Sequence, residues 1–210
     1  MNLLSNSQCV VFEPNYHAQD SSSLTPGTTF AKDPYVRSTA HYDAYCFIRV
    51  EVPTVKFTLS GKTSAVSDAV KMLYNGKEGI NVSEWKAVKE IPSDTEGTNS
   101  VYIFEYIGNG GILKARSSTG KLFDSMQMPG TLSGAKVTAV SDFTGAVTVQ
   151  GYVISTASAS SIEDAYNQLQ DRMNTDGEYS SNSSAYDNGQ QGVIDTLEKK
   201  SWIYRGRLMT

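Results

Sequence analysis

Residues 45–59, with the sequence YCFIRVEVPTVKFTL, carry the strongest β-strand signal in the chain. Residues 45–51 are rich in aromatic and β-branched side chains, which are enriched in strands. Pro53 interrupts this run, and apolar and polar side chains then alternate from Val55 to Leu59. Such alternation with a period of two is typical of a strand with one buried face. The stretch therefore predicts one strand on each side of the proline.

Further candidate strands follow this stretch, and glycines separate them from one another. They cover residues 101–107, 112–116, 121–126, 136–140 and 146–155. Several short strands punctuated by turn signals are typical of a sandwich or a barrel. We therefore expect a mainly β fold of short antiparallel strands, with residues 45–174 as the core domain and two or three short helices.

Three segments show the apolar spacing of an amphipathic helix. Residues 66–74 place Val66, Ala69, Val70 and Leu73 on one helical face, and residues 162–173 form a second apolar stripe. Ser160 with Glu163 resembles a capping box before that second helix. Residues 193–200 predict a third, shorter helix, whereas residues 84–91 fit either a helix or a strand.

The two ends of the chain differ in composition from this core. Residues 1–44 contain one apolar run and several prolines, and this pattern predicts an extended N-terminal arm with one strand near residues 8–13. Residues 175–192 lack large aliphatic side chains and read as a flexible linker. Residues 193–210 then form a predicted C-terminal helix and docking tail. The sequence leaves open whether the arm and the tail pack on their own core or on a neighbour.

Composition argues against several classes of function. The net charge is −4, from 18 basic and 22 acidic residues, and nucleic-acid binders instead carry a basic stripe. No apolar run approaches the roughly 20 residues needed to span a bilayer. The first residues also lack the basic start and apolar stretch of a secretory signal. We therefore expect cytoplasmic synthesis, with neither nucleic acid nor membrane as a partner.

The residues that usually carry chemistry do not form a recognisable site. Residues 60–63, SGKT, match the end of a phosphate-binding loop but lack its first glycine. His17 and His41 both lie in the predicted arm, which is a poor scaffold for catalysis. Cys9 and Cys46 lie in apolar runs and are predicted to be buried, reduced thiols. We therefore predict no catalytic residue, no cofactor and no metal site.

The C-terminal tail is the one segment whose composition indicates binding. Trp, Tyr and Arg are enriched at interaction hot spots, and the tail combines them with aliphatic residues. The predicted partner-binding residues are Val193, Ile194, Leu197, Trp202, Ile203, Tyr204 and Arg205. The alternative is that residues 202–205 form the last strand of the core.

In composition and layout, the chain resembles accessory structural proteins of tailed-bacteriophage virions, such as capsid decoration or tail proteins. The shared features are many Ser, Thr, Gly and Tyr residues, short strands, and an arm and a tail around a β core. The resemblance implies a structural virion protein that binds copies of itself or a coat or tail protein. Two alternatives stay open: a carbohydrate- or receptor-binding β domain, in which tyrosines stack on sugar rings, and an enzyme of unrecognised mechanism.

Overall fold

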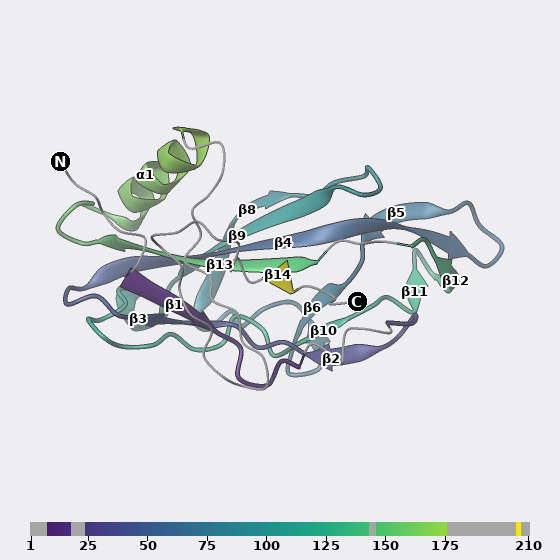
Figure 1. The fold of residues 1–210 in the computed structure, drawn as a ribbon, viewed down its shortest axis with the longest axis horizontal. Helices are drawn as coiled ribbons and strands as arrows, with labels where there is room; N and C mark the ends of the chain where they lie inside the picture. Colours follow the sequence, from purple (N-terminus) through teal and green to yellow (C-terminus); the bar gives the residue numbers. More distant parts are fainter. Residues whose placement is uncertain (1–7, 18–23, 143–145, 176–204, 207–210) are drawn as a thin grey trace.

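The computed structural model describes residues 8–17, 24–142, 146–175 and 205–206, and within them the chain is mainly β (Figure 1). Its strands, in chain order, are β1 (Cys9–Phe12), β2 (Thr29–Ala31), β3 (Tyr35–Ser38), β4 (Ala44–Leu59), β5 (Ala65–Asp68), β6 (Lys71–Tyr74), β7 (Lys77–Glu78), β8 (Trp85–Ile91), β9 (Asn99–Tyr106), β10 (Ser125–Gln127), β11 (Thr131–Leu132), β12 (Ala135–Val140), β13 (Val147–Ser155) and β14 (Arg205–Gly206). One α-helix, α1 (Ile162–Thr175), follows β13 within this part of the chain. The predicted mainly β fold is therefore confirmed.

The long strand β4 is the spine of the large sheet, and every strand paired with it is antiparallel. Its first half lies between β9 and β13, and its second half lies between β12 and β5. The prediction that Pro53 separates two strands was wrong, because β4 runs unbroken through 16 residues. Pro53 lies where the pairing with β13 has ended and that with β5 begins, and its carbonyl still accepts from the Ala69 N–H at 2.7 Å. The missing N–H of proline therefore costs no ladder bond there.

Two smaller sheets cover one face of the large sheet and complete a sandwich. They consist of β1 with β3, and of β2, β10, β6 and β7 in that order; Figure 1 shows both beneath β4 and β13. The side chains of Cys46, Ile48 and Val50 point into the core between the layers. Phe47, between Cys46 and Ile48, packs on the opposite face. The alternation along β4 thus separates a main core from a second cluster under α1.

Helix α1 confirms the prediction of a helix at residues 162–173. Leu169 and Ala165 are buried against Phe47, Tyr152 and Ile154 on the outer face of the large sheet.

The N-terminal cap of α1 lies one residue later than the sequence suggested. The Ser161 hydroxyl accepts from the Asp164 N–H at 3.1 Å, and the Asp164 carboxylate accepts from the Ser160 N–H at 2.8 Å. The first bond satisfies a backbone donor that the first turn of α1 leaves without a partner, and the second ties down the residue before the cap.

The predicted helix at residues 66–74 is wrong, because this segment forms strands β5 and β6. Pairing of β5 with β4 overrides the helical spacing of the apolar residues. The Asp68 carboxylate also accepts from the Ser100 and Tyr102 hydroxyls, each at 2.5 Å. Contacts with residues distant in sequence therefore determine the structure of this segment, as they often do when local propensity is weak.

The predicted N-terminal arm contributes to the core of its own chain. Strands β1, β2 and β3 all lie within residues 1–44, and Val11, Phe30 and Val36 are buried in the main core. The density of Pro and Gly misled the prediction here, because short strands between turns carry the same composition. The described part of residues 1–44 is thus part of the sandwich and not an extended arm.

The other predictions for secondary structure agree with the structure to different degrees. Residues 84–91, left ambiguous by the sequence, contain β8, and residues 101–107, 136–140 and 146–155 overlap β9, β12 and β13. Residues 121–126 overlap only the start of β10, and residues 112–116 form an isolated bridge between Leu113 and Ala44. The predicted linker, residues 175–192, and the predicted helix, residues 193–200, lie outside the described residues except for Thr175. Among the described residues, no helix combines the length and the apolar character that crossing a bilayer requires.

Candidate functional site

The outer edge of β13 is the candidate site for association. Backbone groups of Thr148, Gln150, Tyr152 and Ile154 face β4, because the Thr156 N–H bonds to Asp43 and the pairing continues at every second residue. The alternate residues of β13 therefore direct their N–H and C=O groups to the outer edge. These are Val147, Val149, Gly151, Val153 and Ser155.

Only the first part of this edge is paired within the described residues. Strand β14 pairs antiparallel with it at Val147 and Thr148. Beyond that point, the described part of the chain supplies no strand for the edge at Val149, Gly151 or Val153. A strand edge whose N–H and C=O groups pair with no neighbouring strand can pair with a strand from another chain.

The sequence of β13, VTVQGYVIS, contains neither a charged residue nor a proline. Natural edge strands usually contain such residues, because charges and prolines discourage pairing with another chain. The side chains of Val149 and Gln150 are buried. Strand β13 thus has the composition of a covered strand.

Close packing holds β13 against the sheet of β1 and β3, which we call the N-terminal layer. A Cβ atom at Gly151 would lie 2.9 Å from Cγ2 of Val11 and 3.2 Å from Cγ2 of Val36. Only glycine allows β1 and β3 to approach this closely. The position of the β13 edge is therefore fixed by packing as well as by the β4 ladder.

A row of polar side chains lies on the outer face of the sheet beside α1. Gln150 accepts from the Arg49 guanidinium at 3.1 Å and from the Tyr152 hydroxyl at 3.0 Å. Arg49 also forms an ion pair with Glu51, whose other oxygen accepts from Asn99 at 3.1 Å. Arg49 and Gln150 are both buried, and the bond between them links β4 to β13. The row therefore fixes the positions of β4 and β13 relative to each other.

Only one of the predicted partner-binding residues falls within the described part of the chain. Arg205 lies in β14, and its backbone pairs with Thr148 of β13. The other predicted residues lie outside the described residues: Val193, Ile194, Leu197, Trp202, Ile203 and Tyr204. The structure therefore places Arg205 and Gly206 of the predicted tail against a strand edge that sequence reasoning had not identified.

Sequence reasoning also missed a buried ionic cluster next to the ends of β1 and β2. The Lys32 ammonium lies 2.8 Å from Oε1 of Glu13 and 4.3 Å from the centre of the Tyr16 ring, and all three side chains are buried. Burial raises the pKa of the Glu13 carboxyl above its ordinary value, and the nearby Lys32 charge opposes that shift. Because a buried charge needs a partner, the pair ties the segment after β1 to the segment after β2.

Asp33 forms a second part of this cluster. Its carboxylate accepts from the backbone and side-chain amides of Asn15, at 3.0 and 2.7 Å, and lies 2.8 Å from the Lys121 ammonium. No sequence motif links these residues, since each comes from a different irregular segment.

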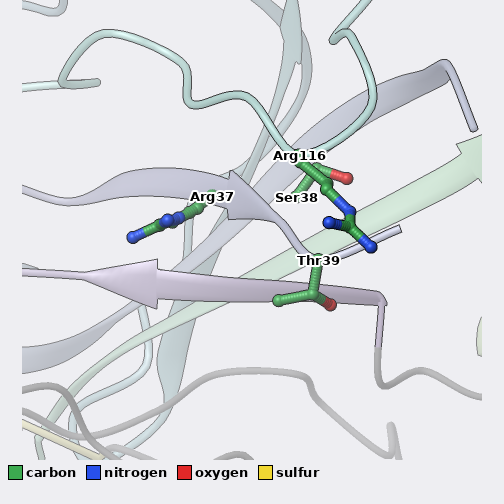
Figure 2. A pocket seen from close by; sticks show the side chains of 4 residues that line it. All are labelled: Arg37, Ser38, Thr39 and Arg116. Carbon is green, nitrogen blue, oxygen red and sulfur yellow. The ribbon is translucent and has the colours of Figure 1, made fainter. Parts of the chain in front are cut away.

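A polar pocket lies at the end of β3, with a volume of about 350 Å³. Arg37, Ser38 and Thr39 of this segment line it together with Arg116 from the loop opposite. Figure 2 shows Arg116 and Thr39 projecting toward one side of the pocket and Arg37 toward the other. The Arg116 guanidinium also lies 2.8 Å from Nδ1 of His41.

The thiols do not have the properties of nucleophiles. Cys9 and Cys46 are both buried and form no disulfide, as predicted. Burial raises the pKa of the Cys9 thiol to about 12 and that of Cys46 well above its ordinary value. Both thiols therefore stay protonated near neutral pH, whereas a reactive cysteine needs its thiolate.

Potential metal ligands are dispersed over the described residues, where no three His, Cys, Asp or Glu side chains come together. The loop at residues 60–63 is a turn between β4 and β5, and its Lys62 donates to the Ser133 carbonyl at 2.5 Å.

With this geometry defined, we compared the chain with known proteins. No family model, no curated protein and no solved structure matches it.

Proposed function

We propose that this chain is a structural, non-catalytic component of a virion, assembled with copies of itself or with a coat or tail protein. The pairing of the chain's C-terminal backbone with the edge of β13 is the observation that supports this proposal most directly. A strand edge that accepts a short segment from the C-terminus can accept the same segment from a neighbouring copy, as in domain swapping.

The chemistry of the edge and the tail supports the same mode of association. Strand β13 offers uncharged residues and amide groups at its edge, and strand addition gains affinity mainly from backbone hydrogen bonds. The residues just before Arg205 supply the side chains that mark interaction hot spots, namely Trp202, Ile203 and Tyr204. Val193, Ile194 and Leu197 add apolar area to the proposed contact.

The choice of a virion as the assembly rests on the resemblance in composition and layout. In this proposal the chain is made in the cytoplasm and incorporated into the particle, and it needs no cofactor, nucleic acid or membrane. If coat or tail genes do not neighbour the gene for this chain, the virion part of the proposal fails, while association through β13 can still be tested.

Deletion of residues 176–210 tests the role of the tail. We expect the truncated chain to have a lower mass than the full chain by light scattering after size-exclusion chromatography. The same mass and the same bound partners before and after truncation would refute the proposal.

Replacement of Val153 with Lys tests the edge itself. Val153 and Val88 are both half-buried valines in strands of the same sheet, so Val88→Lys in β8 is a matched control. A charge at position 153 should lower the mass of the assembly, because charged side chains discourage strand addition. The control should leave the mass unchanged, and equal effects of the two variants would argue against a specific role for β13.

A further inference from the structure

The buried ion pair of Lys32 and Glu13 has an incomplete hydrogen-bond geometry. Nζ of Lys32 lies 2.8 Å from Oε1 and 3.0 Å from Oε2 of Glu13, but only Oε2 accepts a hydrogen bond from it. Among the described residues, Oε1 has no hydrogen-bond partner. A buried ion pair offsets its desolvation only when the geometry is excellent and the remaining polar atoms are satisfied. In its charged form, this pair therefore leaves a buried oxygen unsatisfied.

Burial, and not distance, distinguishes this pair from the other ion pairs of the described residues. Lys71 and Glu78 also lie 2.8 Å apart, but their side chains are 33% and 66% exposed, so water hydrates both charges. The side chains of Lys32 and Glu13 are 1% and 0% exposed. Only the second pair is thus held in contact where water does not reach either group.

Burial favours the uncharged forms of these two groups, because ions lose their hydration inside the protein. It raises the pKa of the Glu13 carboxyl, a shift that the Lys32 charge opposes and the Asp33 charge supports. Transfer of one proton from the ammonium to the carboxylate gives a neutral carboxylic acid and a neutral amine. A neutral lysine amine is a nucleophile, so the two groups can then react with each other.

The surroundings of the pair favour condensation over hydrolysis. The Tyr16 ring is buried and covers the amine, with its centre 4.3 Å from Nζ of Lys32. Groups held in a productive orientation react as if at an effective concentration on the order of 10⁵ M or higher. Exclusion of water also prevents the reverse reaction, in which water would attack the product.

We propose that Lys32 and Glu13 become joined by an intramolecular isopeptide bond once the chain has folded. After one proton has moved from Nζ to Oε1, the Nζ lone pair attacks Cδ of Glu13 and the Cδ–Oε1 bond breaks. Oε1 leaves as water, with the transferred proton and a second proton from Nζ. One amide N–H and one C=O replace two buried charges, and the oxygen without a partner is removed. The condensation needs no oxidant and no second substrate.

The bond would join two layers of the sandwich. Glu13 directly follows β1, and Lys32 directly follows β2. The isopeptide bond therefore ties the N-terminal layer covalently to the four-stranded sheet of β2, β10, β6 and β7. This inference is independent of the proposed function, because it concerns the chain's own layers and not its association.

Mass spectrometry of the folded full chain, denatured and reduced just before measurement, tests the proposal. We expect a mass lower than that of the sequence by one water molecule. Because Lys32 is the first Lys or Arg of the chain, trypsin should leave residues 1–37 as one peptide that lacks one water. Cleavage before Asp20 should then leave the segments with Glu13 and Lys32 joined. A peptide of unshortened mass would overturn the proposal.

A double variant assigns the bond to these two residues. Glu13→Leu with Lys32→Met removes both reacting groups, an exchange for apolar residues that buried ion pairs often tolerate. Thermal unfolding verifies that this variant folds, and it should then show its full sequence mass. The exposed Lys71–Glu78 pair is the control within the same chain, and its tryptic peptides should be unlinked. Loss of water in the folded double variant, or linkage of Lys71 to Glu78, would refute the proposal.

Discussion

Strands β8 and β13 lie on opposite sides of the β9–β4 pair, and they differ in how their outer edges are protected. Strand β8, WKAVKEI, carries two lysines and a glutamate, has a register shift between Ala87 and Lys89, and is followed by Pro92. Each of these features discourages a further strand. Strand β13 has none of them, and β14 already pairs with its first residues.

The difference indicates that β8, and not β13, is adapted to present its outer edge to solvent. The side chains of Lys86 and Ala87 are exposed, whereas Val149, Gln150 and Tyr152 of β13 are buried. Helix α1 covers one face of β13, and β1 with β3 covers the other. A strand whose two faces are covered needs no charged side chains, and its edge stays available for pairing where no strand of the described residues occupies it.

The largest expected effect comes from breaking the cover of β13 with Leu169→Asp. Leu169 is 2% exposed and packs on Phe47, Tyr152 and Ile154. An unpaired carboxylate there should lower the free energy of unfolding by about 3–5 kcal/mol. Urea unfolding measures the change. The exposed Asn167→Asp is the control on the same helix, and similar midpoints for the two variants would mean that α1 does not cover the sheet.

The second-largest effect is expected from overpacking the contact of β13 with β1 and β3. Gly151→Val places methyl groups against Val11 and Val36, where even a Cβ atom is too close to Val11. Overpacking of this kind typically costs about 1–3 kcal/mol. Ala87→Val in exposed β8 should change stability by less than about 0.5 kcal/mol. Thermal unfolding of both variants compares the two edges directly, and equal melting temperatures would contradict the close packing at Gly151.

Removal of two of the three charges of β8 should make it behave more like an unprotected edge. The pair Lys89→Thr and Glu90→Thr keeps β-forming side chains and the net charge, so stability should change by less than about 0.5 kcal/mol. We expect new concentration-dependent association in light scattering. The same replacements at the loop residues Lys62 and Glu96 control for the loss of two charges, and association in that control would remove the argument from edge chemistry.

The smallest effect concerns the cap that holds α1 over β13. Hydrogen bonds from the Ser160 backbone and the Gln168 side chain lower the pKa of Asp164. A carboxylate with a lowered pKa stabilises the fold at pH values above its unfolded pKa of about 3.9, and this contribution is lost as the pH falls through the folded pKa. Asp164→Asn should therefore melt slightly below the wild type near neutral pH, and the difference should vanish in strong acid. A difference independent of pH would assign the effect to packing.

Sequence patterns identified the strands of the core because alternation along a half-buried strand is a local signal. The stripe of residues 162–173 identified α1 for the same reason. The same reasoning failed at residues 66–74, where a helical spacing coincides with strands that pair with β4. It also failed for β1 to β3, whose short runs between prolines become strands only through contacts with distant residues.

The candidate sites were less accessible to prediction than the fold. The pocket combines Arg37 and Arg116, which a bridge between Arg37 and Ser118 brings to neighbouring positions. The edge of β13 becomes recognisable only when the pairing order of the sheet is known. A weak signal did exist in the sequence, because β13 is a long strand without charge or proline.

The central position of β4 has a consequence for the order of events during synthesis. This strand emerges early, but its lateral partners β5, β9, β12 and β13 all follow it along the chain. Strand β5 follows β4 directly, but β9, β12 and β13 lie far along the chain, and their pairing is slow because a long loop must close before each contact forms. A nascent chain therefore exposes the apolar face of β4 until β13 leaves the ribosome. Slow translation after β4 should thus favour aggregation or chaperone capture of this protein over early domain formation.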